Sequence, residues 1–437
     1  MFQAINHRAM TSTTGRGFMR GLRLRLRLRL GERLRTSSRA AQWGVYPQGF
    51  CGIAPLSGSL QVSYRCGVRT KIYLSVGILA RNEEKTIGAA LASLFKQSLF
   101  PRLAERGLFC EVLCVANGCT DGTEQVAARA IGVRVEGALD EPVGKVVSLA
   151  ERGRNNAWNQ FVHRLSAREA EYLVFMDADI VLRGVDTLWK MLAALEQEPS
   201  AHAAVDVPRK DLLFKQRKSL RERLSLAVSQ LTRHAPAQLC GQLYCIRAEV
   251  ARKVYLPRDL AACEDGFIKS LLCTDFLACA LTPERIRLAD GAEHIFAAYT
   301  SAADVFRNQK RQVMGQTIVH ILIDNHLKEL PETQRACLAE TLRHRDEADP
   351  AWLKRLIADH LKERRFFWRL YPGFIRYPFR RWLALPVAKR LVCFPAAVAR
   401  LGFSLVAGFA AWQMLKRGCT DYWPQPERQA LTSAEVV

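Results

Sequence analysis

The chain has 437 residues, of which 49% are hydrophobic, and this is enough for one large domain with appendages. Its net charge of +22 is confined to two flanks. Residues 1–70 and residues 361–418 each carry a net +11, and the tail after residue 418 carries −2, which leaves +2 for residues 71–360. A nearly neutral central domain argues against a protein that binds nucleic acid, so no nucleic-acid partner is expected.

The first 70 residues are rich in arginine and contain a single acidic residue, Glu32. Leucine and arginine alternate from Leu22 to Leu30, but no partner strand pattern lies nearby. We expect residues 1–70 to be a disordered or dispensable extension. An organelle transit peptide, which would also be arginine-rich and acid-poor, is the alternative.

From Lys71 onward, short apolar runs alternate with amphipathic stretches. Strands are predicted at Ile72–Ala80, Val112–Ala116, Val133–Glu136 and Tyr172–Met176, with helices at Glu83–Gln97, Thr123–Ala130 and Lys145–Leu165. This alternation indicates an α/β fold with a mostly parallel sheet flanked by helices. Ligands of such sheets bind at the carboxyl ends of the strands, where this chain places its polar clusters.

The clearest of these clusters is Asp177-Ala178-Asp179, which directly follows the apolar run Tyr172–Met176. Two carboxylates at this spacing, where a buried strand emerges, can bind a divalent cation together with a diphosphate. Acidic residues also commonly end strands in solvated loops, so the pattern alone is a weak signal. It predicts a metal site only in combination with the other clusters.

Two further loops follow the first two predicted strands. Glu83 opens the first helix, where it could bind a nucleotide or simply complement the helix dipole. Asp121 lies in an Asn-Gly and Asp-Gly loop, where it could instead cap the next helix. Lys145 is expected at a helix start, where it could contact a phosphate. Neither G-x-G-x-x-G nor the P-loop pattern is present, which argues against a nicotinamide dehydrogenase and an NTPase.

Later in the chain, Glu264-Asp265 offers a general base or a helix cap. Arg307 and Arg311 are four residues apart, so one helical face could clamp phosphate oxygens or be a solvated basic surface. A basic amphipathic helix is predicted over residues 209–235.

The C-terminal region, residues 321–437, is predicted to be helical, with a basic and aromatic segment at residues 365–418. Its longest apolar stretch, Leu391–Leu415, is interrupted by Pro395 and Arg400 and is therefore a poor membrane span. An amphipathic segment on an anionic membrane surface is expected, with an ordinary packing appendage as the alternative.

Residues 71–320 resemble the family 2 glycosyltransferases of the GT-A fold, which use nucleotide sugars. The resemblance is carried by motifs that occur in order: Arg81 to Ile87, Ala116 to Thr123, Gly144-Lys145, Asp177 to Asp179, Cys240 to Arg247, and Glu264 to Gly266. It implies a catalytic domain at 71–320, preceded by the extension 1–70 and followed by the helical region 321–437.

The resemblance also implies a role for each matching residue. The nucleoside would lie near Glu83 and Asp121, and the uracil or phosphates near Lys145. The residues that would bind the donor are Asn82, Glu83, Asp121, Lys145, Asp177, Arg307 and Arg311. Mg²⁺ or Mn²⁺ would be held by Asp179 and Asp177, with His294 as a possible third ligand. In the acidic pair Glu264-Asp265, the second residue, Asp265, would be the general base.

The implied reaction is transfer of one sugar from a nucleoside-diphosphate sugar, with a UDP-sugar favoured, to an acceptor hydroxyl with inversion. The Gln-x-x-Arg-Trp motif of processive synthases is absent near Arg311, which favours addition of a single sugar. A lipid-linked or glycan acceptor, a role in surface polysaccharide or glycolipid synthesis, and a cytoplasmic location on the inner face of the cell membrane are expected. A retaining GT-A enzyme, a sugar-nucleotide nucleotidyltransferase and a non-catalytic membrane adaptor are the alternatives.

Overall fold

The computed structural model describes residues 71–132, 143–219, 239–260, 263–299, 301–363 and 386–420, together with residues 222, 226, 379 and 382–384. The extension 1–70 and the predicted strand Val133–Glu136 lie outside this range, as does most of the predicted helix over residues 209–235.

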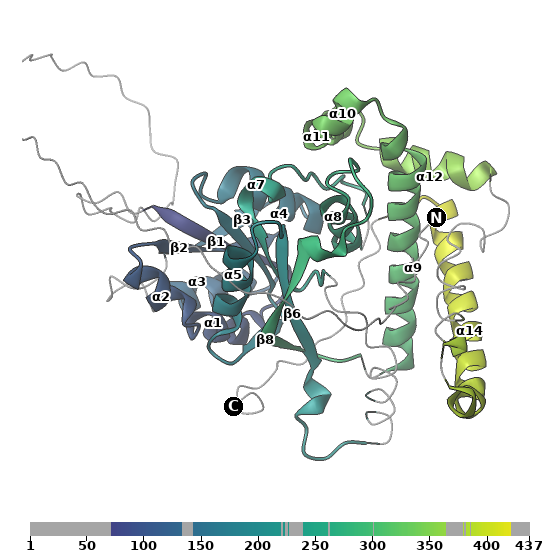
Figure 1. Cartoon of the computed structure of the whole chain (residues 1–437), viewed down its shortest axis with the longest axis horizontal. Coiled ribbons are helices and arrows are strands. Elements are labelled where there is room, and N and C mark those ends of the chain that lie inside the picture. Colours follow the sequence, from purple (N-terminus) through teal and green to yellow (C-terminus); the bar gives the residue numbers. More distant parts are fainter. Residues whose placement is uncertain are drawn as a thin grey trace, which may run out of the picture. The chain divides into compact units, whose positions relative to one another are not determined.

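The described part of the chain is built on a mixed sheet flanked by helices (Figure 1). Its strand order is β3-β2-β1-β4-β7-β6-β8-β5. The strands are β1 (Ile72–Ala80), β2 (Phe109–Asn117), β3 (Val143–Leu149), β4 (Tyr172–Asp177), β5 (Ile180–Arg183), β6 (Ala203–Lys210), β7 (Leu243–Arg247) and β8 (Ile286–Phe296). Strands β3, β2, β1 and β4 are mutually parallel, as the alternating pattern predicted. The pairs β4–β7, β6–β7 and β5–β8 are antiparallel, whereas β6 and β8 run parallel.

Helices cover both faces of this sheet, and further helices follow in the C-terminal region. The helices are α1 (Ile87–Phe95), α2 (Leu99–Glu105), α3 (Thr123–Gly132), α4 (Arg154–Gln160), α5 (Thr187–Gln197), α7 (Ala248–Ala251), α8 (Glu264–Cys273), α9 (Ala302–Asn325), α10 (Glu332–Ala336), α11 (Leu338–Ala348), α12 (Trp352–Glu363) and α14 (Val387–Lys416). Strand β4 shows why two cores result: Leu173 and Phe175 enter one hydrophobic cluster, and Val174 and Met176 enter the other. A strand that is apolar on both faces belongs in the middle of a covered sheet.

The predicted helix Lys145–Leu165 is wrong in its first half, which forms the edge strand β3. Gly144 pairs with Val112 in the parallel ladder, and a Cβ at Gly144 would lie 2.5 Å from the Ile131 side chain of α3. The glycine therefore permits close packing of strand and helix. The helix begins only at Arg154, after Gly153 with its φ of 150°, and continues as a π-helix over Phe161–Leu165.

The helix predicted over residues 209–235 does not begin at its first residue. Arg209 and Lys210 end β6, because their backbone pairs with Ile295 and Phe296 of β8. A short 3₁₀ turn follows at Asp211–Leu213. Backbone pairing with β8 therefore prevails here over the helical spacing of the apolar residues.

In the C-terminal region, α9 runs without a break through the predicted domain boundary at residue 320. Figure 1 shows α9 and α14 side by side, and the Phe306 and Phe403 rings of these helices lie 5.6 Å apart in an edge-on contact. Within the described residues, none of the helices has the length and apolar content needed to cross a membrane. The division of the chain into domains stays a prediction.

Candidate active site

The carboxyl ends of β1, β2 and β4 lie at one edge of the sheet. The register pairs Ala80 with Ala116 and Leu79 with Asp177. The loops that begin at Arg81 and Gly118 and the acidic end of β4 therefore emerge together. This is the position at which open α/β sheets bind ligands.

The loops after β1 and β2 are held together by side-chain hydrogen bonds. Asn82, in a left-handed conformation with φ 54°, accepts a bond from the Thr120 backbone N–H at 2.8 Å and donates from Nδ2 to Thr120 Oγ1 at 3.1 Å. The Glu83 N–H donates to Thr123 Oγ1 at 2.7 Å. The two loops are therefore joined beside the strand ends.

Asp121 lies in the second of these two loops. Its carboxylate accepts hydrogen bonds from the Glu84 N–H at 3.2 Å and from the Thr123 N–H at 3.1 Å. Burial acts to raise the pKa of Asp121, but the hydrogen bonds from Thr123 and Glu84 outweigh it, and the pKa lies below its ordinary value. Asp121 thus accepts hydrogen bonds at the start of α3, as the capping interpretation expects, and its contact with a nucleoside stays a prediction.

Arg154, which was not among the predicted site residues, connects the Asp177-Ala178-Asp179 motif with the Glu264-Asp265 pair. Its guanidinium lies 2.8 Å from Asp177 Oδ1 and 2.5 Å from Glu264 Oε1. It also donates to the Gly241 carbonyl oxygen at 2.8 Å. No local signal in the sequence could have identified it, because the predicted helix Lys145–Leu165 placed Arg154 in mid-helix, whereas α4 begins at Arg154.

Asp265 lies next to this ion pair, in the first turn of α8. Burial and the adjacent Glu264 raise the pKa of Asp265 to about 6, against the opposing effects of the Gly266 N–H, Arg311 and Arg154. The Gly266 N–H donates to Asp265 Oδ1 at 2.7 Å. A carboxylate with a raised pKa is a stronger base than an ordinary aspartate and is still ionised at neutral pH.

Glu264 and Asp265 border a small hollow at the end of β4. Its lining consists of Leu79, Arg154, Trp158, Phe175, Met176, Asp177, Gly241, Tyr244, Glu264 and Asp265. A Cβ at Gly241 would lie 3.4 Å from Glu264 Oε1 and 3.5 Å from the Asp265 Cβ, which is ordinary van der Waals contact, so Gly241 lies directly beside this acidic pair.

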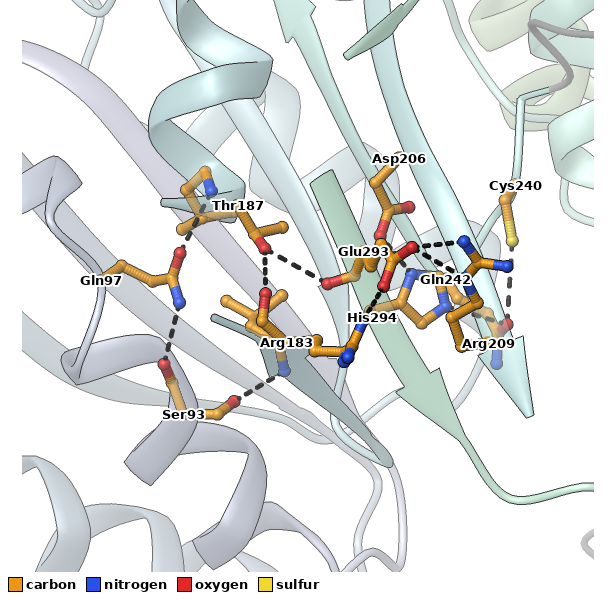
Figure 2. A network of polar contacts seen from close by, with 12 residues as sticks. Ser93, Gln97, Arg183, Thr187, Asp206, Arg209, Cys240, Gln242, Glu293 and His294 are labelled. Atoms are coloured by element: carbon orange, nitrogen blue, oxygen red, sulfur yellow. Dashed lines mark hydrogen bonds and ion pairs between the residues drawn. The ribbon is translucent and has the colours of Figure 1, made fainter. Parts of the chain in front are cut away.

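The other predicted metal ligands are buried. Asp179 is 6% exposed and lies in the turn between β4 and β5. Figure 2 shows His294 between Asp206 and Gln242: its Nδ1 is 2.7 Å from Asp206 Oδ2, and its Nε2 is 3.4 Å from Gln242 Oε1. Throughout the described residues, no three His, Cys, Asp or Glu side chains converge to hold a metal ion.

The three basic residues predicted to bind the donor have different surroundings. Arg311 is close enough to Asp265 to lower its pKa. Arg307 instead forms an ion pair with Asp304 on its own helix, α9. Lys145 is exposed in the middle of β3 and pairs with Leu113, about 13 Å along the strand before the carboxyl end of β2.

Comparison with known proteins gives one family. Residues 75–250 match the family model described as Glycosyl transferase family 2. This segment contains the loops after β1 and β2, Arg154 and the Asp177-Ala178-Asp179 motif, and it ends before Glu264. No curated protein matches the chain significantly.

Among solved structures, the mannosyltransferase PcManGT from Pyrobaculum calidifontis, in complex with GDP-Man and Mn²⁺, is 18% identical, with a TM-score of 0.45 over 78% of this chain and 88% of that one. TarS from S. aureus is 18% identical, with a TM-score of 0.39 over 79% of this chain and 90% of that one. Glucosyl-3-phosphoglycerate synthase from Mycobacterium tuberculosis, with Mn²⁺, uridine diphosphate and glucosyl-3-phosphoglycerate, is 19% identical, with a TM-score of 0.36 over 60% of this chain and 82% of that one.

Proposed function

We propose that the chain is a member of glycosyl transferase family 2, whose model matches residues 75–250, and that it transfers a single sugar from a nucleoside-diphosphate sugar to an acceptor hydroxyl with inversion. The observation that carries this proposal is Asp265, a carboxylate with a pKa raised to about 6 beside the acidic end of β4. An acceptor hydroxyl is a weak nucleophile and needs such a base as the new bond forms.

In the proposed reaction, the acceptor oxygen attacks the anomeric carbon while the bond from that carbon to the diphosphate oxygen breaks. The hydroxyl proton passes to Asp265, and the nucleoside diphosphate leaves with the bonding electrons. One displacement from the face opposite the leaving group inverts the anomeric configuration. Glu264 is less suited to accept the proton, because its carboxylate is already paired with Arg154 at 2.5 Å.

For the donor, we assign the nucleoside to the joined loops after β1 and β2, which carry Asn82, Glu83 and Asp121. Mg²⁺ or Mn²⁺ would be held by Asp177 and Asp179, whose oxygens suit hard cations. Because no three His, Cys, Asp or Glu side chains of the described residues form a group that could hold a metal ion, the diphosphate would complete the coordination. Such a cation would neutralise charge that develops on the leaving diphosphate.

His294 meets only part of the requirements for a third metal ligand. Its Nδ1 contact with Asp206 would orient the ring, as carboxylates do for metal-bound histidines, but its Nε2 faces Gln242. Gln242 would therefore have to move before His294 could bind a metal. Arg311, which lies near Asp265, is a better candidate for a phosphate contact than Lys145.

We further propose a lipid-linked or glycan acceptor and a role in surface polysaccharide or glycolipid synthesis at the inner face of the cell membrane. The support is the basic segment 361–418, with its net charge of +11, which suits an anionic membrane surface.

The assignment is tested by measuring binding and hydrolysis of a panel of UDP- and GDP-sugars by the full chain with Mg²⁺ or Mn²⁺. We expect one donor to bind only with metal, Asp179→Ala to abolish this binding, and Asp265→Asn to bind the donor without turnover. Absence of binding by every donor with either metal would refute the proposal. Full turnover by Asp265→Asn would refute the assignment of the base.

A further inference from the structure

One face of α14 exposes a row of large apolar side chains. The row consists of Val387, Leu391, Phe394, Val398 and Leu401, and we call it the apolar stripe. The spacing alternates between four and three residues, which places all five on one helical face. Leu391 is 72% exposed and Val387 is 66% exposed. Soluble proteins rarely leave a continuous apolar surface of this kind uncovered.

The packed side of α14 lies elsewhere on the helix. Ser404, Ala407, Ala411 and Leu415 are buried, and Phe403 contacts Phe306 near the start of α9. These contacts fix the second half of the helix. The stripe precedes them in the chain, and its exposure shows that no described part of the chain covers it.

Charge distinguishes between the partners that could cover the stripe. From Val387 to Gly418 the chain contains five basic residues and no acidic one. Arg390 and Arg400 are among them, and both belong to the segment that carries the stripe. A second copy of α14 would bring arginines against arginines, with no acid on the helix to pair with them. An anionic lipid surface offers both the apolar interior and the opposite charge.

Aromatic side chains gather at the start of the stripe. The Trp382 ring lies 5.9 Å from the Phe394 ring and 5.8 Å from the Phe379 ring. Phe379 and Phe394 are each more than half exposed. Tryptophan and other aromatic residues prefer the boundary between lipid headgroups and acyl chains.

We propose that the apolar stripe of α14 inserts into the headgroup boundary of an anionic lipid surface, so that apolar burial, and not charge alone, holds the protein there. This deepens the membrane partner named in the proposed function and rests on it for the acceptor.

The test measures sedimentation of the full chain with vesicles of phosphatidylcholine alone and of phosphatidylcholine with phosphatidylglycerol, at 0.1 and 0.5 M salt. We expect stronger binding to the anionic vesicles, with a substantial part retained at 0.5 M salt, because apolar insertion is not screened. The triple variant Leu391→Asp, Val398→Asp, Leu401→Asp should lower the partition coefficient at least 10-fold. Leu281→Asp, which changes an exposed leucine outside α14, should leave it unchanged.

Vesicle binding by the triple variant equal to the wild type would overturn the proposal, as would complete release of the wild type at 0.5 M salt. Sedimentation velocity provides a further check: a wild-type dimer, a monomeric variant and no vesicle binding by either would identify the stripe as a self-interface and refute lipid insertion. Donor hydrolysis without vesicles is independent of the stripe and should be equal in both proteins. Its absence from a wild type that still binds vesicles would refute the transferase assignment alone.

Discussion

Replacement of the candidate base should make the fold more stable at neutral pH. The pKa of Asp265 is raised from its ordinary value of 3.8 to about 6, chiefly by burial and then by Glu264. Each pKa unit corresponds to about 1.4 kcal/mol, so the ionised carboxylate costs the folded state up to about 3 kcal/mol at pH 7.5. Asn keeps the acceptor oxygen for the Gly266 N–H and has no charge, so Asp265→Asn should recover about 1–3 kcal/mol.

The sign of this effect depends on pH. A carboxyl group whose pKa is raised by folding stabilises the fold at low pH and loses this contribution as pH rises through about 6. The gain from Asp265→Asn should therefore shrink to about 1 kcal/mol at pH 4.5. Urea unfolding of both proteins at pH 7.5 and 4.5 measures the difference, with Asp290→Asn on the exposed surface of β8 as the matched control. Equal gains at the two pH values, or a loss at pH 7.5, would refute the reasoning.

Three further predictions concern the same region. The rate of sugar transfer should fall as pH drops below about 6, because protonated Asp265 accepts no proton; a pH–rate profile flat from pH 5 to 8 would argue against this base. Arg154→Gln leaves two carboxylates without their counter-ion and should lower the free energy of unfolding by about 3 kcal/mol or more. It should also move the midpoint of the pH–rate profile upward, since Arg154 lowers the pKa of Asp265; an unmoved midpoint would contradict this. Tyr244→Phe removes the acceptor of the buried Trp158 indole N–H, a bond of 2.7 Å, and should cost about 1–3 kcal/mol, measured as a lower thermal midpoint; an unchanged midpoint would contradict it.

Local sequence patterns determined much of the parallel half of the sheet. The strand predicted at Ile72–Ala80 has the bounds of β1, and the apolar run Tyr172–Met176 forms β4 with its acids at the carboxyl end. Both outcomes follow from runs of residues that are buried on two faces, a property the chain shows without knowledge of its partners. The position of the acids at a strand end needed no tertiary information.

The tertiary structure decided the features that depend on distant partners. Val143–Leu149 became a strand because β2 offered a free edge, although the sequence pattern favoured a helix. Arg154 bridges Asp177 and Glu264, the latter 110 residues away in the chain, and no local pattern encodes that meeting. The raised pKa of Asp265 likewise arises from burial, which is a property of the packed fold. Spacing along the chain identifies the residues able to do chemistry, but only folding brings distant charges together in a medium of low polarity, where their interaction is strong.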